Sequence, residues 1–449
     1  MTARTTIFAL SSGPLPAGIA VVRLSGPGAG MALDALAAPR PEPRRASLRR
    51  LLNPSDGLPI DEALVLWLPG PDTATGEDMA EFHLHGSAAV VERLTAALMA
   101  LPGMALAEPG EFTRRAFANG RMDLAQVEGL SDLLAAQTAR QHQQALRLFS
   151  GRASSVFEGW RQQIIAAEAS LTAAIDFSDE EDVGSRALAD LHPRLISLIE
   201  TLTAARAQAA RAGSVRDGVK VVFAGVPNAG KSSLLNRLAL RDAAIVSPEA
   251  GTTRDVIEVP VSLAGYRVIL TDTAGLRDFP EGPMVEQEGM RRARAEAAAA
   301  DLVIWVTAPD VEPGEPPVAR PDLVLLNKAD LLAGPTESIR TRNGESYPLD
   351  LAVSAKSGAG LELLLARLTT MISTRMMGAE EAVVLRARHV AAVEKTIRFL
   401  NDAIRAEKMG LEVMAEALRE ASRSLASLTG RVDVEDVLGQ IFSEFCIGK

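Results

Sequence analysis

The chain lacks several features that mark secreted, membrane-spanning or disulfide-stabilised proteins. Its 449 residues include one cysteine, Cys446, so no disulfide can form within the chain and a reducing cytosol is the expected compartment. No run of about 18 or more uncharged apolar residues offers a membrane span. The opening MTARTTIFALSSG lacks the apolar core and cleavage site of a secretory signal. We expect a cytoplasmic protein without a membrane partner.

Positive charge and aromatic residues are also scarce. The formal net charge of −10 argues against broad binding to phosphate backbones, so any RNA contact would be local or shared with a partner. Aromatic residues make up 4% of the chain while Ala and Leu are abundant, which indicates much helix. At 449 residues the chain is too long for one compact core, and we expect two or three domains.

The first 118 residues mix short strands with turns. Apolar runs at 18–26 and 62–70 end in glycine, residues 80–86 alternate between apolar and polar, and 37–45 reads as an exposed Pro/Arg loop. This pattern predicts an α+β domain over 1–118.

Helical periodicity replaces the strands over 119–215, where Leu124, Val127 and Leu134 recur at helical spacing. It returns over 379–449. There the residues expected on one helix face are Val390, Val393, Ile397, Leu400 and Ile404.

Residues 216–378 carry a third pattern, in which apolar runs alternate with helical or loop stretches. The runs are VKVVFAG, YRVILTD, ADLVIWVT, PDLVLLN and LDLAVSA. They predict a buried, parallel, doubly wound α/β sheet. Since the ends of a domain tend to lie close together, helical stretches on both sides suit an insertion. We expect a discontinuous helical domain, in halves 119–215 and 379–449, interrupted by this α/β domain.

A nucleotide-binding motif follows the first of these runs. GVPNAGKS (225–232) matches G-x-x-x-x-G-K-[ST], with a strand pattern before it and a helical pattern after it. In such a loop backbone N–H groups surround phosphate, Lys231 reaches the β- and γ-phosphate oxygens, and Ser232 supplies a hydroxyl to Mg²⁺. Taken alone, the motif also fits a glycine-rich turn.

Two motifs place carboxylates near this loop. DTAG (272–275) ends the run YRVILTD, with Asp272 as the carboxylate on the Mg²⁺ side. NKAD (327–330) ends LVLLN, and Asp330 can accept hydrogen bonds from N1–H and N2–H₂ of guanine, a donor pair that adenine lacks. Such a site selects GTP over ATP.

Two further motifs complete the set. SAK (354–356) closes the base pocket, and GTTRD (251–255) offers Thr253 to Mg²⁺ and the γ-phosphate. The sites lie at the carboxyl ends of predicted strands, where an open α/β sheet binds ligands. The ordered motifs predict a GTPase domain.

The residue that activates water is less evident. A Ras-type site orients water with a Gln, but Leu276 follows DTAG here and cannot do so. Asn228 could help hold a monovalent cation beside the phosphates, and Glu286 could orient the water through another molecule. On residue type alone, each fits an ordinary surface polar group equally well.

Taken together, these motifs and several segments outside the domain resemble the MnmE (TrmE) family of tRNA-modification GTPases. GVPNAGKSSLLN, AGTTRD, DTAGLR and NKAD match the GTPase domain, and Era/Der-type GTPases share most of them. More specific are GIAVVRLSG, LPGPDTATGED, the His-Gly pair at 85–86, PGEFTRRAF, MDLAQVEGLSDL and the final FCIGK. The resemblance spans the whole chain.

The resemblance implies an N-terminal domain that binds folate and dimerises, a helical domain, and an inserted Ras-like P-loop GTPase domain. It also implies a K⁺-dependent GTPase that works as a homodimer with the flavoprotein MnmG (GidA). Together they would install a carboxymethylaminomethyl or aminomethyl group at C5 of the wobble uridine in certain tRNAs. A tetrahydrofolate derivative, 5-formyl- or 5,10-methylene-tetrahydrofolate, would supply the one-carbon unit.

The resemblance further assigns residues of the GTPase domain. Glu286 is the expected water-positioning residue, since Val285 before it and Gly289 after it favour it over Glu288. Mg²⁺ is assigned to Ser232 and Thr253. K⁺ is assigned to Asn228, Ser247, Glu249 and Thr252. The residues expected to contact GTP are Asn228, Ala229, Gly230, Lys231, Ser232, Ser233, Ser247, Pro248, Glu249, Ala250, Gly251, Thr252, Thr253, Asp272, Thr273, Ala274, Gly275, Asn327, Lys328, Ala329, Asp330, Ser354, Ala355 and Lys356.

Polar residues in the N-terminal strand patterns are candidates for a second site. Arg23 shares a face with Ile19 in an otherwise apolar run, so it is either a structural ion pair or a ligand contact. Glu81, His83 and His85 share one strand face. A metal site there lacks a nearby third ligand, and we expect structural histidines with Glu81 bound to pterin-type N–H donors.

Arg121 fits either an exposed charge at a helix start or a ligand contact. The resemblance assigns Arg23, Glu81, Arg121 and Lys449 to the folate site, where basic groups suit the glutamate carboxylates of folate.

The final FCIGK matches a C-a-a-X prenylation signal when read literally, but Gly448 is not aliphatic and no polybasic segment precedes it. We expect Gly448 to let the tail turn into the folate site. Lys449 would then face the ligand, and Cys446, a candidate reactive thiol, would lie near the one-carbon unit. Deleting the five residues should harm tRNA modification more than GTP binding.

Two alternative functions share the GTPase motifs. One is an Era/Der-like ribosome-associated GTPase, which would be expected to carry an RNA-binding module such as a KH domain. The other is a GTP-binding switch that recruits a partner without its own role in tRNA modification.

Overall fold

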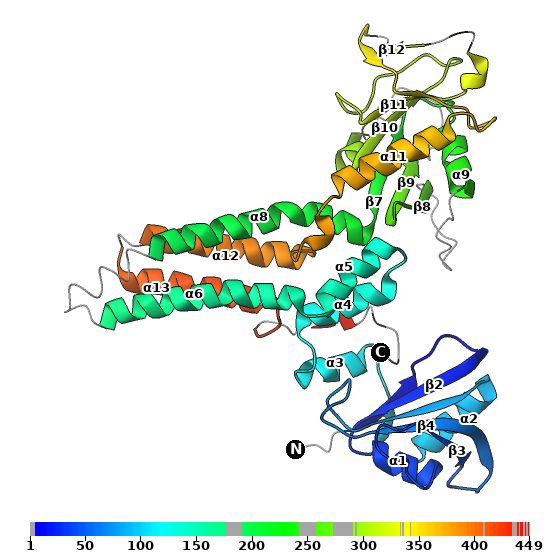
Figure 1. The fold of residues 1–449 in the computed structure, drawn as a ribbon, viewed down its shortest axis with the longest axis vertical. Coiled ribbons are helices and arrows are strands. Elements are labelled where there is room, and N and C mark those ends of the chain that lie inside the picture. Colours follow the sequence, from blue (N-terminus) through cyan, green and yellow to red (C-terminus); the bar gives the residue numbers. More distant parts are fainter. Residues whose placement is uncertain are drawn as a thin grey trace. The chain divides into compact units, whose positions relative to one another are not determined.

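The computed structural model contains two compact units (Figure 1). One comprises Met1–Ser131, Leu148–Ile165 and Ser422–Lys449, and the other comprises Asp132–Arg147 and Ala166–Ala421. Each unit therefore joins segments that are distant in sequence. The residues that the structure describes are 5–176, 191–241, 257–272, 291, 294–332, 334, 336–341, 343–406, 409–432, 438–439, 441–442, 445 and 448.

A six-stranded sheet forms the centre of the N-terminal region. Its strands are β1 (Thr6–Leu10), β2 (Ala17–Ser25), β3 (Ser47–Leu52), β4 (Pro59–Leu68), β5 (Met79–Gly86) and β6 (Met104–Leu106). They lie in the order β3-β4-β5-β2-β1-β6, antiparallel except for the β1–β6 pair. The strands expected at 18–26, 62–70 and 80–86 are confirmed as β2, β4 and β5.

One face of this sheet packs against two helices. These are α1 (Ala29–Leu36) and α2 (Ala88–Met99). Val22 and Phe82 point into this core, where Leu33 of α1 meets them. Because successive strand residues point to opposite faces, Arg23 and Glu81 lie on the other face. The alternation thus separates an apolar core from a polar surface.

The opposite face is partly covered by helix α3 (Glu111–Ala118), which follows β6. Phe112 of α3 is buried together with Ile7 and Ala9 of β1. Gly110 precedes the helix with φ +67°, a left-handed conformation that suits glycine. This small second core fixes α3 to the sheet edge.

The C-terminal segment returns to the same unit. Ile441, Phe442 and Phe445 are buried against Leu124 and Val127 of helix α4 (Leu124–Ala135). The described residues of the C-terminal segment therefore bury their apolar side chains in this unit. Leu134 does not share the buried face expected for it, since its side chain is 46% exposed.

Gly448 docks on strand β1. Its carbonyl oxygen accepts a hydrogen bond from Ser11 Oγ at 2.9 Å. Gly448 has φ +96°, and a Cβ added there would lie 2.2 Å from the carbonyl oxygen of Leu10. Only glycine can lie this close to the Leu10 carbonyl without displacing the backbone. The turn expected at Gly448 is therefore present, while Cys446 and Lys449 lie outside the described residues.

Long helices make up most of the remaining framework. They are α5 (Ala139–Phe149), α6 (Arg152–Asp176), α8 (Leu191–Asp217), α12 (Ala387–Ala406) and α13 (Leu411–Ala426). Helices α8 and α12 lie side by side, although about 170 residues separate them in sequence. Arg419 of α13 pairs with Glu168 of α6 at 3.2 Å.

The buried stripe of α12 differs from the expected one. Val393 and Leu400 are buried as predicted, but Val390, Ile397 and Ile404 are only half-buried. The remaining buried positions include Ala392, Thr396 and Ala403. The Thr396 hydroxyl donates to Ala392 O at 2.8 Å, which satisfies its polar group. Small side chains therefore share the buried face with Val393 and Leu400, while Val390, Ile397 and Ile404 lie along its edges.

The inserted domain has a second six-stranded sheet. Its strands are β7 (Val219–Ala224), β8 (Ile257–Leu263), β9 (Tyr266–Asp272), β10 (Leu302–Thr307), β11 (Leu323–Leu326) and β14 (Leu351–Ala352), in the order β14-β11-β10-β7-β9-β8. Its packed core draws on helices α9 (Lys231–Arg241) and α11 (Leu361–Arg375). A short hairpin of β12 (Ser338–Arg340) and β13 (Ser346–Pro348) and two 3₁₀ turns, η1 (Ala329–Leu331) and η2 (Ala379–Glu381), complete it.

The predicted parallel sheet is correct except at one edge. The pairs β14–β11, β11–β10, β10–β7 and β7–β9 are parallel, whereas β8 runs antiparallel to β9. Ala264 and Gly265 connect these two strands with φ of +53° and +79°. Two consecutive positive φ values are typical of the tight turn that joins antiparallel strands.

Replacing Gly448 with Ala should release the tail from β1. The positive φ strains a residue with a side chain by about 1–3 kcal/mol, so the undocked tail should become roughly 5- to 150-fold more populated. Release of the last residues by carboxypeptidase measures this population.

Gly439→Ala is the matched control, because a Cβ at Gly439 meets nothing within 4 Å. Digestion of Gly448→Ala at the wild-type rate would show that the docking seen at β1 does not hold the tail in solution.

Candidate functional site

The loop between β7 and α9 has the backbone conformation of a phosphate-binding loop. Gly225, Asn228 and Gly230 have φ of +154°, +64° and +83°. A Cβ at Gly225 would lie 2.0 Å from Val306 O, and one at Gly230 would lie 2.4 Å from Asn327 Nδ2. Both glycines are therefore required by contacts as well as by backbone shape. The loop leads directly into α9, whose first N–H groups suit a phosphate anion.

Lys231 and Ser232 lie at the start of α9, where the motif predicts them. Lys231 is 3% exposed, and its Nζ donates to Gly225 O at 2.8 Å and to Val226 O at 3.0 Å. Ser232 Oγ donates to Asp272 Oδ2 at 2.5 Å. The structure thus brings together Ser232 and Asp272, the hydroxyl and carboxylate expected on the Mg²⁺ side. Hard oxygen donors of this kind suit Mg²⁺.

Asn327 connects the phosphate-binding loop to the base-recognition loop. It is 1% exposed, and its Nδ2 donates to Ala229 O at 2.9 Å and to Gly230 O at 3.3 Å. Its Oδ1 accepts from Ala355 N at 3.1 Å. One buried amide therefore holds three motifs in fixed relative positions. The sequence motif identified Asn327, but only the structure gives this bridging role.

Asp330 and Lys328 occupy the positions expected of base-recognition residues. Ser354 Oγ donates to Asp330 Oδ1 at 2.6 Å, and this hydrogen bond lowers the pKa of the Asp330 carboxyl. The carboxylate therefore remains ionised and able to accept from guanine N–H groups. Lys328 has φ +56°, and its Nζ lies 2.6 Å from Asp310 Oδ2. Nothing in the sequence indicated that Asp310 would pair with Lys328.

Part of the expected GTPase site falls outside the described residues. These positions are Ser247, Pro248, Glu249, Ala250, Gly251, Thr252, Thr253, Thr273, Ala274, Gly275 and Glu286. Of the residues expected around K⁺, the structure describes Asn228, and of those expected around Mg²⁺ it describes Ser232. These assignments remain predictions.

The second group of candidate residues lies on the N-terminal sheet. Arg23 of β2 and Glu81 of β5 face each other in register. Arg23 Nε donates to Glu81 Oε1 at 2.9 Å, and His83 Nε2 lies 3.0 Å from Glu81 Oε2. Of the two roles open to Arg23 from the sequence, the structure shows the ion pair. Its part in binding a ligand remains a prediction.

The pKa of Glu81 reflects two opposing effects. Partial burial raises it, but hydrogen bonds from His83 and Arg23 and the Arg23 charge outweigh burial, so the pKa is lowered overall. His85, expected on the same face, binds a different carboxylate, with Nδ1 2.8 Å from Asp61 Oδ1. Within the described part of the chain, no group of three His, Cys, Asp or Glu residues could hold a metal.

Arg121 lies in the turn before α4 and packs on a loop of the sheet. Its Nη1 is 3.5 Å from Asp72 Oδ1, and both side chains are substantially exposed. A Cβ added to Gly76 would lie 3.3 Å from Arg121 Cγ, so the absence of a side chain there makes room for the arginine. The 72–76 loop therefore positions Arg121.

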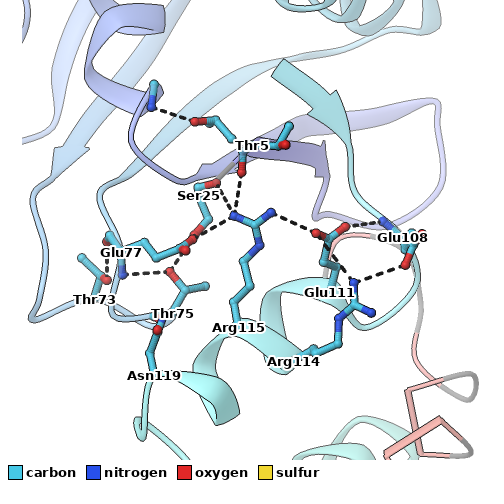
Figure 2. A network of polar contacts seen from close by, with 12 residues as sticks. Thr5, Ser25, Thr73, Thr75, Glu77, Glu108, Glu111, Arg114, Arg115 and Asn119 are labelled. Atoms are coloured by element: carbon cyan, nitrogen blue, oxygen red, sulfur yellow. Dashed lines mark hydrogen bonds and ion pairs between the residues drawn. The ribbon is translucent and has the colours of Figure 1, made fainter. Parts of the chain in front are cut away.

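A polar network that sequence reasoning missed holds this loop (Figure 2). Arg115 of α3 is at its centre, with Nη1 2.9 Å from Thr5 O and 3.1 Å from Glu77 Oε2, and Nη2 3.0 Å from Glu111 Oε1. Ser25 Oγ donates to Glu77 Oε2 at 2.7 Å. Ser25 ends β2, two residues beyond Arg23 on the same face.

The network continues to the turn that carries Arg121. Ser25 Oγ lies 2.7 Å from Thr75 Oγ1, and Asn119 Nδ2 donates to Thr75 O at 2.7 Å. The segments TATGED and EFTRRAF supply most of these residues. The contacts between these residues could not be predicted from the sequence, because the partners are up to 110 residues apart.

No helix in the described parts of the chain is long and apolar enough to cross a membrane.

The phosphate loop, the Ser232–Asp272 pair and the base-recognition motif lie at the carboxyl ends of β7, β9 and β11. This arrangement defines a P-loop GTPase domain inserted into a helical framework. A family model described as MnmE helical domain matches residues 124–446, and one described as GTP-binding protein TrmE N-terminus matches residues 6–121. The chain belongs to the MnmE family of tRNA modification GTPases.

Curated relatives agree over the full length. The chain is 48% identical to the tRNA modification GTPase MnmE of Bradyrhizobium sp. (strain BTAi1), over 99% of both chains. It is 47% identical to that of Rhodopseudomonas palustris (strain CGA009) and 48% identical to that of Methylobacterium sp. (strain 4-46), again over 99% of each. The family resemblance, the fold class and the GTPase identity expected from the sequence are confirmed, and the ribosome-associated alternative is disfavoured.

Solved structures give weaker likenesses. A crystal structure of Era in complex with MgGDPNP and nucleotides of 16S ribosomal RNA is 23% identical, with a TM-score of 0.24. It covers 34% of this chain and 56% of that chain. A likeness of this size adds nothing to the assignment by full-length relatives.

Glu81→Gln should destabilise the N-terminal sheet in a pH-dependent way. The folded-state pKa of Glu81 is lowered below its ordinary value of 4.5, so its ion pair stabilises the fold above that pH. The stabilisation is lost as the pH falls through the lowered pKa. We expect the variant to lose about 1–2 kcal/mol at pH 7, and the loss should shrink as the pH falls through the lowered pKa, measured by calorimetric unfolding.

Glu92→Gln serves as the control, because Glu92 is an exposed carboxylate on α2 of the same domain. A loss for Glu81→Gln that does not change as the pH is lowered from 7 to well below 4.5 would contradict the ion-pair account.

Proposed function

We propose that the protein is a K⁺-dependent GTPase that acts with the flavoprotein MnmG on the wobble uridine of certain tRNAs. Together they install a carboxymethylaminomethyl or aminomethyl group at C5, and a tetrahydrofolate derivative supplies the one-carbon unit. Two observations carry the proposal. The chain is a full-length member of the family, and the described motifs of its guanine-nucleotide site are joined to one another by hydrogen bonds.

The residues of the GTPase site are proposed to bind GTP and prepare it for hydrolysis. The P-loop N–H groups and Lys231 bind the phosphates, while Asp330 accepts from guanine, which excludes adenine. Ser232 and Thr253 would hold Mg²⁺, and Asn228, Ser247, Glu249 and Thr252 would hold K⁺. These cations would neutralise charge that develops on the phosphates. Because Leu276 cannot orient water, we assign that role to Glu286.

A folate derivative is proposed to bind the polar face of the N-terminal sheet. Arg23, Glu81, Arg121 and Lys449 would contact it, with basic groups meeting its carboxylates. The docking of Gly448 supports this assignment, because Leu10 beside it is adjacent to Ala9, the residue paired with Arg23. The tail therefore approaches the strand row that carries Arg23 and Glu81. Cys446 remains a candidate reactive thiol in that tail.

A homodimer is proposed through the same sheet. Leu48, Leu64 and His83 lie in one row across β3, β4 and β5. Leu48 and Leu64 are 64% and 46% exposed, and Ile19 of β2, on the same face, is 62% exposed. An apolar cluster of this kind on a sheet face suits a second copy of the chain. The domains proposed are 1–118, 119–215 with 379–449, and 216–378.

The remaining partners follow from charge and chemistry. With a net charge of −10, the protein is not suited to hold tRNA by charge alone, so we propose that MnmG shares the tRNA contact. A cytoplasmic location agrees with one cysteine in the chain.

Reconstitution tests the proposed function. The wild-type protein, an MnmG flavoprotein with a reductant for its flavin, unmodified tRNA, a tetrahydrofolate derivative, GTP and an amine donor (glycine or ammonium) should yield C5-modified uridine in KCl but little in NaCl, measured by nucleoside mass spectrometry. Glu286→Ala should lower the K⁺-stimulated GTPase rate on the order of 100-fold and leave GTP affinity unchanged.

Glu288→Ala is the matched control and should hydrolyse GTP normally. Absence of the modified nucleoside with the wild-type protein in KCl would overturn the function. Normal hydrolysis by Glu286→Ala, or loss in Glu288→Ala instead, would overturn the residue assignment.

A further inference from the structure

The β8–β9 hairpin extends away from the nucleotide site. Strand β8 begins at Ile257, shortly after GTTRD in the sequence, and β9 ends at Asp272, which opens DTAG. The seven residues of β9 span roughly 20 Å at about 3.4 Å per residue. Both GTP-responsive motifs are thus attached to one end of the hairpin, and its Ala264–Gly265 turn lies at the other.

The turn end is fixed by buried polar contacts. Gly265 O accepts a hydrogen bond from Arg140 N of α5 at 3.1 Å. The Tyr266 hydroxyl donates to Glu380 Oε1 at 2.5 Å, and Arg140 Nη1 lies 3.0 Å from the same oxygen. The Arg140 guanidinium also lies 5.3 Å from the centroid of the Tyr266 ring. We refer to Arg140, Tyr266 and Glu380 as the hairpin latch.

Helix α5 has further contacts beside the latch. Arg147 Nη1 donates to Glu380 O at 2.7 Å. Gln141 Nε2 donates to Arg216 O at 2.7 Å, and Gln144 Nε2 donates to Ala212 O at 3.0 Å, both near the end of α8. The helix therefore binds the hairpin turn and both points where the inserted domain joins the helical one.

The hydrogen bonds of the latch favour one position of the hairpin turn relative to α5. Tyr266 is 2% exposed and Glu380 is 8% exposed. Burial and the hydrogen bond to Glu380 raise the pKa of Tyr266 to about 12, so the hydroxyl remains a donor at physiological pH. An apolar pair of similar volume would avoid the desolvation cost. The polar contacts are instead directional, and they are lost when the turn shifts by more than a fraction of an ångström.

The far end of α5 contacts helix α4. Gln126 Nε2 of α4 donates to Phe149 O at 3.1 Å. Gly129 lets the backbones approach, since a Cβ there would lie 2.4 Å from Phe149 N. Helix α4 also packs against Phe442 of the C-terminal segment.

We propose that Tyr266 and Glu380 are positioning residues that couple the nucleotide state of the β8–β9 hairpin to helix α5. The inference rests on the proposed function for the GTP cycle that moves the hairpin. Neither residue contacts GTP, so the latch transmits the state of the site rather than taking part in hydrolysis.

Tyr266→Phe tests the coupling, because it removes the hydroxyl and keeps the ring. Amide hydrogen exchange of α5 (139–149) is compared between GDP and GDP with aluminium fluoride in KCl, using the full chain. The wild-type protein should show a nucleotide-dependent difference in α5, and Tyr266→Phe should reduce that difference at least threefold. Nucleotide affinity and the GTPase rate should stay within twofold of wild type.

Tyr347→Phe is the matched control. Its hydroxyl donates to Glu345 at 2.8 Å on the surface of the same domain, so the variant loses a Tyr–Glu hydrogen bond away from α5 and should exchange like wild type. Should Tyr266→Phe fail to fold by circular dichroism, Glu380→Gln, which removes the ion pair with Arg140, carries the same expectation.

An unchanged nucleotide-dependent difference in the latch variant, or no such difference in the wild-type protein, would overturn the coupling. Failure of the proposed function can be told apart from failure of the coupling. It would appear as lost GTP turnover or lost tRNA modification in the wild-type protein, and hydrogen exchange measures neither of these.

Discussion

The attachment of the inserted GTPase domain to helix α5 is the constraint on which the larger of the two compact units depends. The chain leaves the helical framework at the end of α8 and comes back through η2, and α5 binds both places. Gln144 donates to Ala212 O at 3.0 Å, and Arg147 donates to Glu380 O at 2.7 Å. An inserted domain has two covalent connections that must lie close together. The carbonyl of Arg216, in the last turn of α8, also needs a donor that the helix itself cannot supply. Gln141 of α5 donates to it at 2.7 Å, so α5 meets both requirements.

Stability and position come from different interactions in this protein. Each sheet has its own apolar core, in which a fully buried Leu or Val contributes about 1.5–3 kcal/mol. A hydrogen bond contributes less, about 0.5–1.5 kcal/mol net, but it is directional. The polar contacts therefore decide where functional groups lie. Asn327 sets the spacing of the nucleotide motifs, Arg115 holds the loop beside Arg121, and Glu81 fixes Arg23.

The sequence predicted what is encoded locally. Strand alternation grouped Arg23 with Ile19 and Glu81 with His83, and the P-loop, DTAG and NKAD motifs placed the nucleotide site, because each depends on residues close in sequence. The antiparallel β8 edge was missed, although the Ala264–Gly265 turn encodes it. The buried face of α12 differs from the expected one, because Thr396 and Ala403 are buried while Val390 and Ile397 are only half-buried. The Arg115 network and the contact of Arg147 with Glu380, 233 residues apart, could not be read from spacing.

We propose that GTP bound in the inserted domain controls chemistry that belongs to the rest of the chain. The most direct measurement is mass spectrometry of wobble uridines in tRNA from cells that lack the protein, complemented with the wild-type chain or with Lys231→Ala. The account predicts that C5 modification returns with the wild-type chain and not with Lys231→Ala expressed at the same level. Unchanged C5 modification in cells without the protein, or full restoration by Lys231→Ala, would contradict it.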